Sequence, residues 1–201
     1  MPSARPPWTT RLRAVIWWHR ARDAARDQLP PALRSRRLVP VTIGALVQYL
    51  ESPVGPYAEI LASPVVLLER GLPAAHVPFI AVDSLASAGD GRANWALPKT
   101  LARFAWSGAA ARAAAEGWSV SATTAPSGPR LPLLGLARAL QLDASGRELL
   151  APLAGLGLGR PASVEVSPAG AALPSWLLAG THPGLVLSRA RLRMGAPAVR
   201  P

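Results

Sequence analysis

The chain contains no cysteine, so it can form neither disulfide bridges nor thiolate metal sites. A reducing compartment is the simplest setting for such a chain, and we expect a cytoplasmic protein. Histidine is scarce as well: His19, His76 and His182 lie far apart and show no metal-ligand spacing. The sequence therefore predicts neither a metal site nor a bound cofactor.

Long apolar runs are also missing. No uninterrupted run reaches the roughly 18 residues that a membrane-spanning helix needs. Arginines precede the apolar residues 14–18, as in a signal peptide, but this patch is too short and Arg20 follows it closely. We therefore expect no membrane partner.

Acidic side chains are few, with 11 Asp and Glu against 22 Lys and Arg and a net charge of +11. Such an excess is compatible with nucleic-acid binding. The chain nevertheless has no zinc-finger pattern and no aromatic-basic RNA signature, so we expect no nucleic-acid partner. A basic surface equally suits anionic metabolites or an oligomer interface.

Lysine is nearly absent: Lys99 is the only one, and the other 21 basic residues counted with it are arginines. An amine can be neutralised and used as a nucleophile, whereas a guanidinium stays charged. The stretch before Lys99, residues 93–98, is apolar except for Asn94, and a dry setting disfavours the charged form of a lysine. A neutral amine attacks a ketone to form a Schiff base, an electron sink for breaking a neighbouring C–C bond. The alternative is that a general preference for arginine left one lysine by chance.

Half of all residues are hydrophobic, enough for the core of one domain over residues 1–201. Loose tails are expected at 1–9 and 195–201. Short alternating or apolar runs predict strands; short segments rich in helix formers predict helices; the Gly/Leu-rich residues 155–159 are expected to form a loop. Many strands and few helices indicate a mostly β sheet or barrel. The expected strands are 11–17, 39–49, 57–69, 76–82, 101–106, 112–115, 118–123, 162–166 and 185–194, and the expected helices are 21–28, 83–90 and 143–150.

Three segments together resemble the acetoacetate decarboxylase family. Gly91-Arg92, five residues and then Pro98-Lys99 match the spacing of that family's active-site segment. Gly55-Pro56-Tyr57-Ala58-Glu59 resembles its Gly-x-Tyr-x-Glu motif. Residues 77–83, the stretch 18–33 and the closing segment 182–190 are similar as well. The likeness is clearest over 55–101 and weakest over about 125–175.

The resemblance implies roles for individual residues. Lys99 falls on the Schiff-base lysine and Glu59 on an active-site glutamate that handles protons. Arg11, counted back without a gap, falls on a substrate-binding arginine that would hold a carboxylate. Tyr57 is expected to line the pocket, with Arg92, Trp95 and Leu97 in support. Each role has a structural alternative. Glu59 would instead pair with a nearby arginine, Arg11 would be an ordinary surface charge on a strand, and Tyr57 would be a core residue.

The chain departs from the family pattern at two positions. The family's decarboxylases have a second lysine after the Schiff-base lysine, where this chain has Thr100. A second active-site glutamate of the family, counted back from Glu59, falls on Gly44; Glu51 lies in the same hairpin in an uncertain register.

The resemblance implies an α+β fold, mostly antiparallel β, shaped as a cone-like β-barrel with a few short helices. It implies a homo-oligomeric lyase that decarboxylates a small keto acid through a Lys99 iminium. Because Thr100 and Gly44 break the decarboxylase pattern, an aldolase or dehydratase using the same Schiff base is an alternative. A non-catalytic member that binds a small molecule is another.

Overall fold

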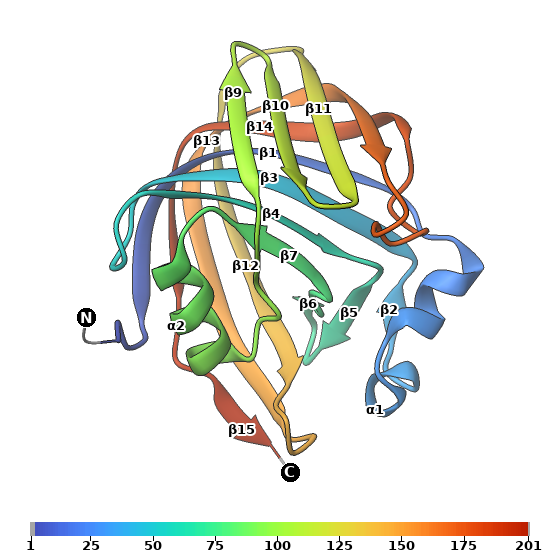
Figure 1. The fold of residues 1–201 in the computed structure, drawn as a ribbon, viewed down its shortest axis with the longest axis vertical. Helices are drawn as coiled ribbons and strands as arrows, with labels where there is room; N and C mark the ends of the chain where they lie inside the picture. Colours follow the sequence, from blue (N-terminus) through green and yellow to red (C-terminus); the bar gives the residue numbers. More distant parts are fainter. Residues whose placement is uncertain (1–2, 201) are drawn as a thin grey trace.

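The computed structural model describes residues 3–200, which form fifteen strands joined by short turns, two short α-helices and one 3-10 helix (Figure 1). In chain order the elements are β1 (Trp8–Arg20), η1 (Asp23–Gln28), α1 (Pro31–Arg34), β2 (Leu38–Val39), β3 (Val41–Glu51), β4 (Tyr57–Ser63), β5 (Val66–Glu69), β6 (Leu72–Ala75), β7 (Phe79–Val82), α2 (Leu85–Trp95), β8 (Thr100–Leu101), β9 (Arg103–Ser107), β10 (Ala110–Ala115), β11 (Trp118–Pro126), β12 (Leu131–Leu142), β13 (Glu148–Ala169), β14 (Gly180–Met194) and β15 (Ala198–Arg200).

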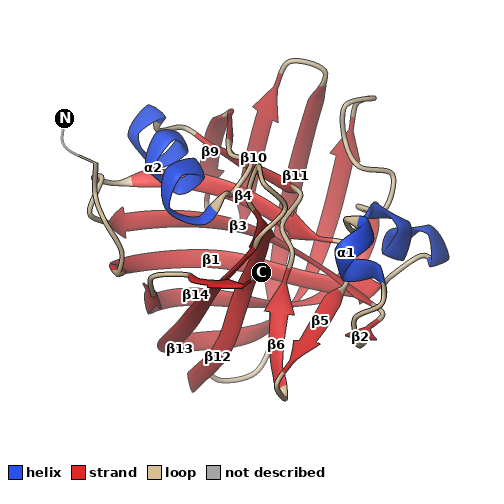
Figure 2. Ribbon diagram, turned by 90° about the horizontal axis from the view of Figure 1, so that it is seen from below, coloured by secondary structure: helices blue, strands red, loops and turns tan. Residues whose placement is uncertain are grey.

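All fifteen strands belong to one strongly bent sheet. Its main path runs β2-β5-β6-β12-β13-β14-β1-β3-β4-β7-β8, and all pairs along it are antiparallel except β6 with β12 and β7 with β8. The path does not join β2 to β8, so the cone-shaped sheet is not a closed barrel. The mostly antiparallel α+β class expected from the sequence is confirmed. The two α-helices lie at opposite ends of the sheet (Figure 2).

The sheet is buried on both faces in its central part. On β1, Val15 and Trp17 face the meander β9-β10-β11, which joins the sheet by pairing with the second half of β13. Leu12 and Ala14, on the opposite face, pack with β3, β4 and α2. Since side chains alternate along a strand, β1 contributes to two cores, and the second contains the candidate site.

Two expectations for the region 143–159 are wrong. Residues 143–150 form no helix: the Asp143 carboxylate accepts hydrogen bonds from the backbone N–H groups of Ser145 and Arg147, which closes a turn leading into β13. The Gly/Leu-rich residues 155–159 are not a loop but the middle of β13. Its neighbours approach so closely that a Cβ at Gly157 would collide with the backbone of Arg189 and Ala190, so glycine is needed there for packing.

The helix and tail boundaries differ as well. The expected helix 21–28 is the 3-10 helix η1, and the expected short helix at 83–90 is the longer α2, capped by Ser84. The tails are not loose over their described parts. The Ala4 backbone bonds Asp90 and Asn94 of α2, and residues 198–200 form β15 against β13. Residues 1, 2 and 201 lie outside the described part of the chain.

Within residues 3–200, no helix is long and apolar enough to cross a bilayer.

Candidate functional site

Lys99 is brought into the fold by the turn that ends α2. Ala96 adopts a left-handed conformation at the helix C-terminus, with φ of 53°, and reverses the chain. The Lys99 N–H then donates to the Leu97 carbonyl at 2.8 Å, which forms a three-residue turn around Pro98. This turn directs Lys99 inward, and only 4% of the residue is exposed.

The spacing between Gly-Arg and Pro-Lys has a physical explanation in this turn. The Arg92 guanidinium donates from Nε to the Lys99 carbonyl at 2.9 Å, and Nη2 donates to the same oxygen. A Cβ at Gly91 would lie 2.7 Å from Lys99 Cδ and 2.8 Å from Cε. Arg92 therefore holds the Lys99 backbone, while Gly91 leaves room for its side chain. Arg92 does not contact the amine.

Glu59 is the partner of the Lys99 amine. It lies on β4 between β3 and β7 and is 3% exposed. Lys99 Nζ donates to Glu59 Oε2 at 2.7 Å and to Ser87 Oγ of α2 at 3.0 Å. The hydroxyl of Tyr49, on β3, donates to Glu59 Oε1 at 3.2 Å. Both carboxylate oxygens are thus hydrogen-bonded within the protein.

The two tyrosines of the chain stack beside this pair, with ring centroids 4.4 Å apart. Burial, followed by the negative charge of Glu59, raises the pKa of Tyr49 and of Tyr57 well above the usual value. Both phenols therefore stay protonated at neutral pH. Lys99 Nζ lies 5.2 Å from the centroid of the Tyr57 ring, whose π face favours a cation.

The amine and the carboxylate face a small cavity of about 50 Å³. Trp8 and Trp95 meet edge to face in its wall, with ring centroids 5.0 Å apart. Most of the remaining wall is apolar. The lining residues are Trp8, Thr10, Tyr49, Tyr57, Glu59, Trp95, Leu97, Lys99, Leu192 and Met194.

Five of the seven residues singled out from the sequence are thus brought together at the cavity: Lys99, Glu59, Tyr57, Trp95 and Leu97. Arg92 supports Lys99 from behind.

Arg11 is not brought to this cavity. It lies on the outer face of β1, with 56% of its side chain exposed, and pairs with Glu51 at 2.7 Å. Thr10, its neighbour in sequence, is the residue of β1 that faces the cavity. A shift of one residue along a strand moves a side chain to the opposite face, so counting back without a gap selected a residue on the face of β1 that points away from the cavity.

The departures from the family pattern also have structural consequences. Thr100 is exposed, and its hydroxyl donates to the Ile80 carbonyl at 3.4 Å. Gly44 packs so closely on Trp17 that any Cβ there would enter the indole ring. Glu51 is engaged by Arg11 on the surface. Among the residues that line the cavity, Glu59 is the only carboxylate.

Sequence reasoning missed several residues of the site. Ser87 bonds Lys99 and Tyr49 bonds Glu59, and the other missed residues line the cavity: Trp8, Thr10, Leu192 and Met194. Ser87 had a usable signal: it precedes Gly91 by four residues, which places both on one face of a helix. Leu192 and Met194 come from a strand almost a hundred residues away, and nothing local in the sequence connects them to Lys99.

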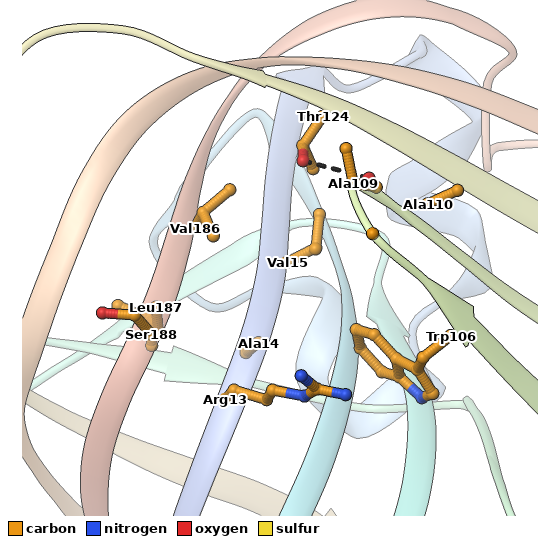
Figure 3. A pocket seen from close by; sticks show the side chains of 11 residues that line it. Arg13, Ala14, Val15, Trp106, Ala109, Ala110, Thr124, Val186, Leu187 and Ser188 are labelled. Carbon is orange, nitrogen blue, oxygen red and sulfur yellow. Dashed lines mark hydrogen bonds between the residues drawn. The ribbon is translucent and has the colours of Figure 1, made fainter.

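A larger pocket lacks this chemistry. It lies between β1, β14 and the β9–β10 turn (Figure 3), has a volume of about 220 Å³ and contains the Arg13 guanidinium 5.4 Å from the Trp106 ring centroid. Thr124 there donates to the Ala109 carbonyl. It has neither a lysine nor a carboxylate in its lining. In residues 3–200, no three His, Asp or Glu side chains are grouped to hold a metal ion.

Solved structures reveal which known proteins share this architecture. No protein-family model and no curated protein matches the chain. An acetoacetate decarboxylase from Legionella pneumophila aligns over 100% of this chain and 92% of its own, with TM-score 0.68 and 14% identity. A second acetoacetate decarboxylase structure aligns over 98% and 90%, with TM-score 0.71 and 12% identity. The fold is that of acetoacetate decarboxylase.

A third structure with this acetoacetate decarboxylase fold is the enduracididine biosynthesis enzyme MppR. It aligns over 98% of this chain and 88% of its own, with TM-score 0.65 and 16% identity. MppR has also been solved with the condensation product of pyruvate and imidazole 4-carboxaldehyde. At these identities the likeness concerns the fold, and the chemistry of the present chain has to be argued from its own residues.

Proposed function

We propose that this protein is a carbon–carbon lyase of the acetoacetate decarboxylase family and that it works through a Schiff base on Lys99. The observation that supports this proposal best is the buried contact of Lys99 Nζ with Glu59 Oε2 at 2.7 Å, at the wall of an otherwise largely apolar cavity. Burying an ion pair is costly, and apolar residues of similar size often stabilise a fold better. A pair kept there, with the only lysine of the chain, suggests a chemical role.

Covalent catalysis would begin with proton transfer from Lys99 to Glu59. The neutral Nζ attacks the carbonyl carbon, and the carbonyl oxygen, which gains one proton from Nζ and one from Glu59, leaves as water. The product is an iminium whose positive charge faces the Glu59 carboxylate and the Tyr57 ring. Tyr49 positions Glu59 by donating to its other oxygen.

The first candidate reaction is decarboxylation of a small keto acid. In a β-keto acid iminium, the bond to the carboxylate breaks, its electron pair moves into the iminium, and CO₂ leaves an enamine on Lys99. Glu59, a carboxylate again once the iminium has formed, takes up a proton from water and delivers it to the enamine carbon. Water then hydrolyses the iminium to release the ketone and free Lys99. The small cavity suits substrates of this size.

The second candidate is an aldol-type reaction or a dehydration through the same iminium. One observation favours it: in contrast to what the resemblance implied for Arg11, the cavity lining contains no arginine to hold a carboxylate. Removal of a proton next to the iminium by Glu59 would give the enamine without loss of CO₂. The enamine would then attack an aldehyde.

Reductive trapping tests the Schiff base directly. The protein is incubated with acetoacetate, pyruvate, acetone or propanal, reduced with cyanoborohydride and weighed intact. Because the chain has a single lysine, its only amines are Lys99 and the N-terminal α-amine. We expect a gain equal to the carbonyl compound less one oxygen atom, and peptide mapping should place it on Lys99.

The matched controls are Lys99→Met and the double variant Lys99→Met/Glu59→Gln, which leaves no buried charge unpaired if the single variant does not fold. Both should show only the slow labelling of the α-amine. An adduct that forms equally in the variants would contradict the proposal. Labelling of Lys99 without turnover of any substrate would instead favour a binding protein that keeps the reactive amine.

We also propose that the protein is a homo-oligomer, as the resemblance implies; its cytoplasmic location stays a prediction. Leu134, Leu136 and Leu156 are 78%, 53% and 62% exposed, and Leu134 lies opposite Leu156 across β12 and β13. A contiguous exposed apolar patch is typical of a contact surface. We expect Leu156→Glu to lower the molar mass in light scattering to that of one chain, while Leu85→Glu, at a position on α2 that is 76% exposed, leaves it unchanged. Equal masses for both variants would place the interface elsewhere.

A further inference from the structure

We infer that the Lys99 cavity takes a small neutral ketone or aldehyde in preference to a keto acid. This inference rests on the proposed Schiff-base function and selects the second of its two candidate reactions. Four properties of the cavity support it: its charge balance, the engagement of its hydrogen-bond donors, the aromatic character of its walls and its size.

The charges in the cavity already cancel. Lys99 is the only cation in the lining and Glu59 the only anion, and they are bonded to each other at 2.7 Å. A bound keto acid would add a second negative charge to a buried site with no further cation. An uncompensated buried charge is strongly unfavourable. A neutral carbonyl compound leaves the balance intact, since its iminium simply replaces the ammonium.

Nearly all the side-chain donors in the lining are already engaged. Trp8 Nε1 donates to the Ala4 carbonyl at 3.0 Å and Trp95 Nε1 to the Gly195 carbonyl at 2.9 Å. Thr10 Oγ1 donates to the Leu192 carbonyl at 3.3 Å, and Tyr49 donates to Glu59. A carboxylate has two oxygens that each accept more than one hydrogen bond. The Tyr57 hydroxyl lies beside Ser87 and Tyr49, and Lys99 Nζ is bonded to Glu59 and Ser87. The lining therefore lacks the several free donors that a carboxylate needs.

Aromatic rings make up much of the wall. Their faces carry partial negative charge, which attracts cations and opposes anions. The Tyr57 ring already lies 5.2 Å from Lys99 Nζ. Such a wall stabilises an iminium but gives no favourable contact to a carboxylate next to it.

The small size of the cavity also disfavours a keto acid, because it leaves no room for substrate groups that could offset the cost of burying a carboxylate. An enzyme can force a carboxylate into a dry site when distant parts of the substrate supply binding energy. A cavity of about 50 Å³ is well below the roughly 300 Å³ at which drug-sized ligand pockets begin. A substrate of about three or four carbons has no distant part, so nothing offsets the burial of its charge.

The reaction that follows is an enamine reaction. Lys99 Nζ forms the C–N bond and one water leaves. Glu59 then removes a proton from the carbon next to the iminium, and the electron pair of that C–H bond forms the C=C bond of the enamine. The enamine carbon adds to the carbonyl carbon of a second, neutral aldehyde, whose oxygen takes the proton from Glu59. Hydrolysis consumes one water and releases a β-hydroxy carbonyl compound. No oxidant or reductant is required.

The test uses matched pairs that differ in charge: pyruvate with pyruvamide, and acetoacetate with acetoacetamide. Cyanoborohydride trapping on Lys99 is measured against concentration and normalised to the rate of each compound with free butylamine. We expect the amides to reach half-maximal labelling at concentrations at least about tenfold lower than the acids. We also expect the methyl protons of acetone to exchange with deuterium in D₂O only when Lys99 is present.

A gain-of-charge variant makes the test sharper. Met194 lies at the partly exposed edge of the lining, so Met194→Arg would add the missing cation, and Met194→Gln is the neutral control of similar length. The arginine variant should lower the half-saturating concentration of pyruvate at least about tenfold, relative to the glutamine variant.

The inference would be overturned if pyruvate and acetoacetate saturate labelling of the wild-type protein at the same concentrations as their amides, or at lower ones. This holds whatever the variants do. In that case Lys99 would still be labelled, and the Schiff-base proposal would stand. If no carbonyl compound labels Lys99, the proposed function itself fails.

Discussion

Replacing Glu59 by glutamine is expected to lower the free energy of unfolding by about 3–5 kcal/mol at neutral pH. The reason is that Lys99, only 4% exposed, would lose the one carboxylate in its cavity. The remaining contact, with Ser87 Oγ at 3.0 Å, is to a neutral group and does not balance an ammonium. Urea denaturation followed by tryptophan fluorescence measures the effect. Glu165→Gln, whose side chain lies on the exposed face of β13, is the matched control and should change the free energy of unfolding by less than about 0.5 kcal/mol.

Combining Glu59→Gln with Lys99→Met should restore the stability of the wild-type protein or exceed it. A buried pair exchanged for neutral groups of similar volume is often neutral or stabilising. The non-additivity of the two substitutions measures how strongly the charges depend on each other. A double variant that is as unstable as Glu59→Gln alone would show that the site is held by packing and not by the pair. A restored double variant would mean that this pair is kept for chemistry.

Glu59→Gln alone is expected to lower any turnover at Lys99 by about 10²- to 10⁴-fold, the usual contribution of a general acid–base group. Schiff-base formation itself should survive in part, because the amine remains. Trapping and turnover measured on one sample of Glu59→Gln separate the two effects.

Much of the fold could be predicted from the sequence where local signals agree. In strands β1, β3 and β4 the residues either alternate between apolar and polar or are continuously apolar. Gly55, with a φ of 86°, allows the turn between β3 and β4. The segment from Gly91 to Lys99 is short and contains its own stop signal in Pro98. These elements position Lys99 and Glu59 by local geometry and one hairpin. Lys99 could be named in advance as the only lysine of the chain, and Glu59 from the resemblance of residues 55–59 to the family motif.

Apart from the expected strand at 162–166, which lies within β13, the region from 125 to 175 could not be predicted, because its glycines are required by neighbours far away in sequence. Gly157 and Gly159 are in β13 because Arg189, Ala190, Leu133 and Leu187 come too close for a Cβ. A glycine-rich segment with no periodicity predicts a loop when it is considered alone. The strand β13 is stabilised by its pairing with β11, β12 and β14, which no local pattern reveals.

The site shows the same limit on a finer scale. Tyr49, Thr10 and Arg11 could be placed only by knowing which face of each strand turns toward Lys99. That choice depends on register, including the bulges between Leu12 and Ala14 in the β1–β14 pair and between Arg11 and Leu12 in the β1–β3 pair. An alignment without gaps carries no information about such a shift, so the residue one position away, Thr10, was overlooked.

Replacing Gly91 by alanine is expected to reduce labelling and turnover at Lys99 by about 10²-fold while leaving the protein folded. The added methyl group would lie 2.7 and 2.8 Å from Lys99 Cδ and Cε, closer than side-chain atoms tolerate. The lysine is flexible, so it would give way, and its Nζ would leave Glu59 Oε2. The experiment compares trapping rates of the variant and the wild-type protein at saturating carbonyl compound.

Gly89→Ala, two residues earlier on α2, is the control that makes this prediction specific. A Cβ at Gly89 meets nothing within 4 Å, so the variant should keep its activity. It should also be more stable by about 0.5–1 kcal/mol, because alanine loses less backbone freedom than glycine in a helix. If both variants lose activity equally, the cause is the helix and not the space beside Lys99. If Gly91→Ala keeps full activity, Lys99 does not react from the position seen here, and the geometry of the proposed site is wrong.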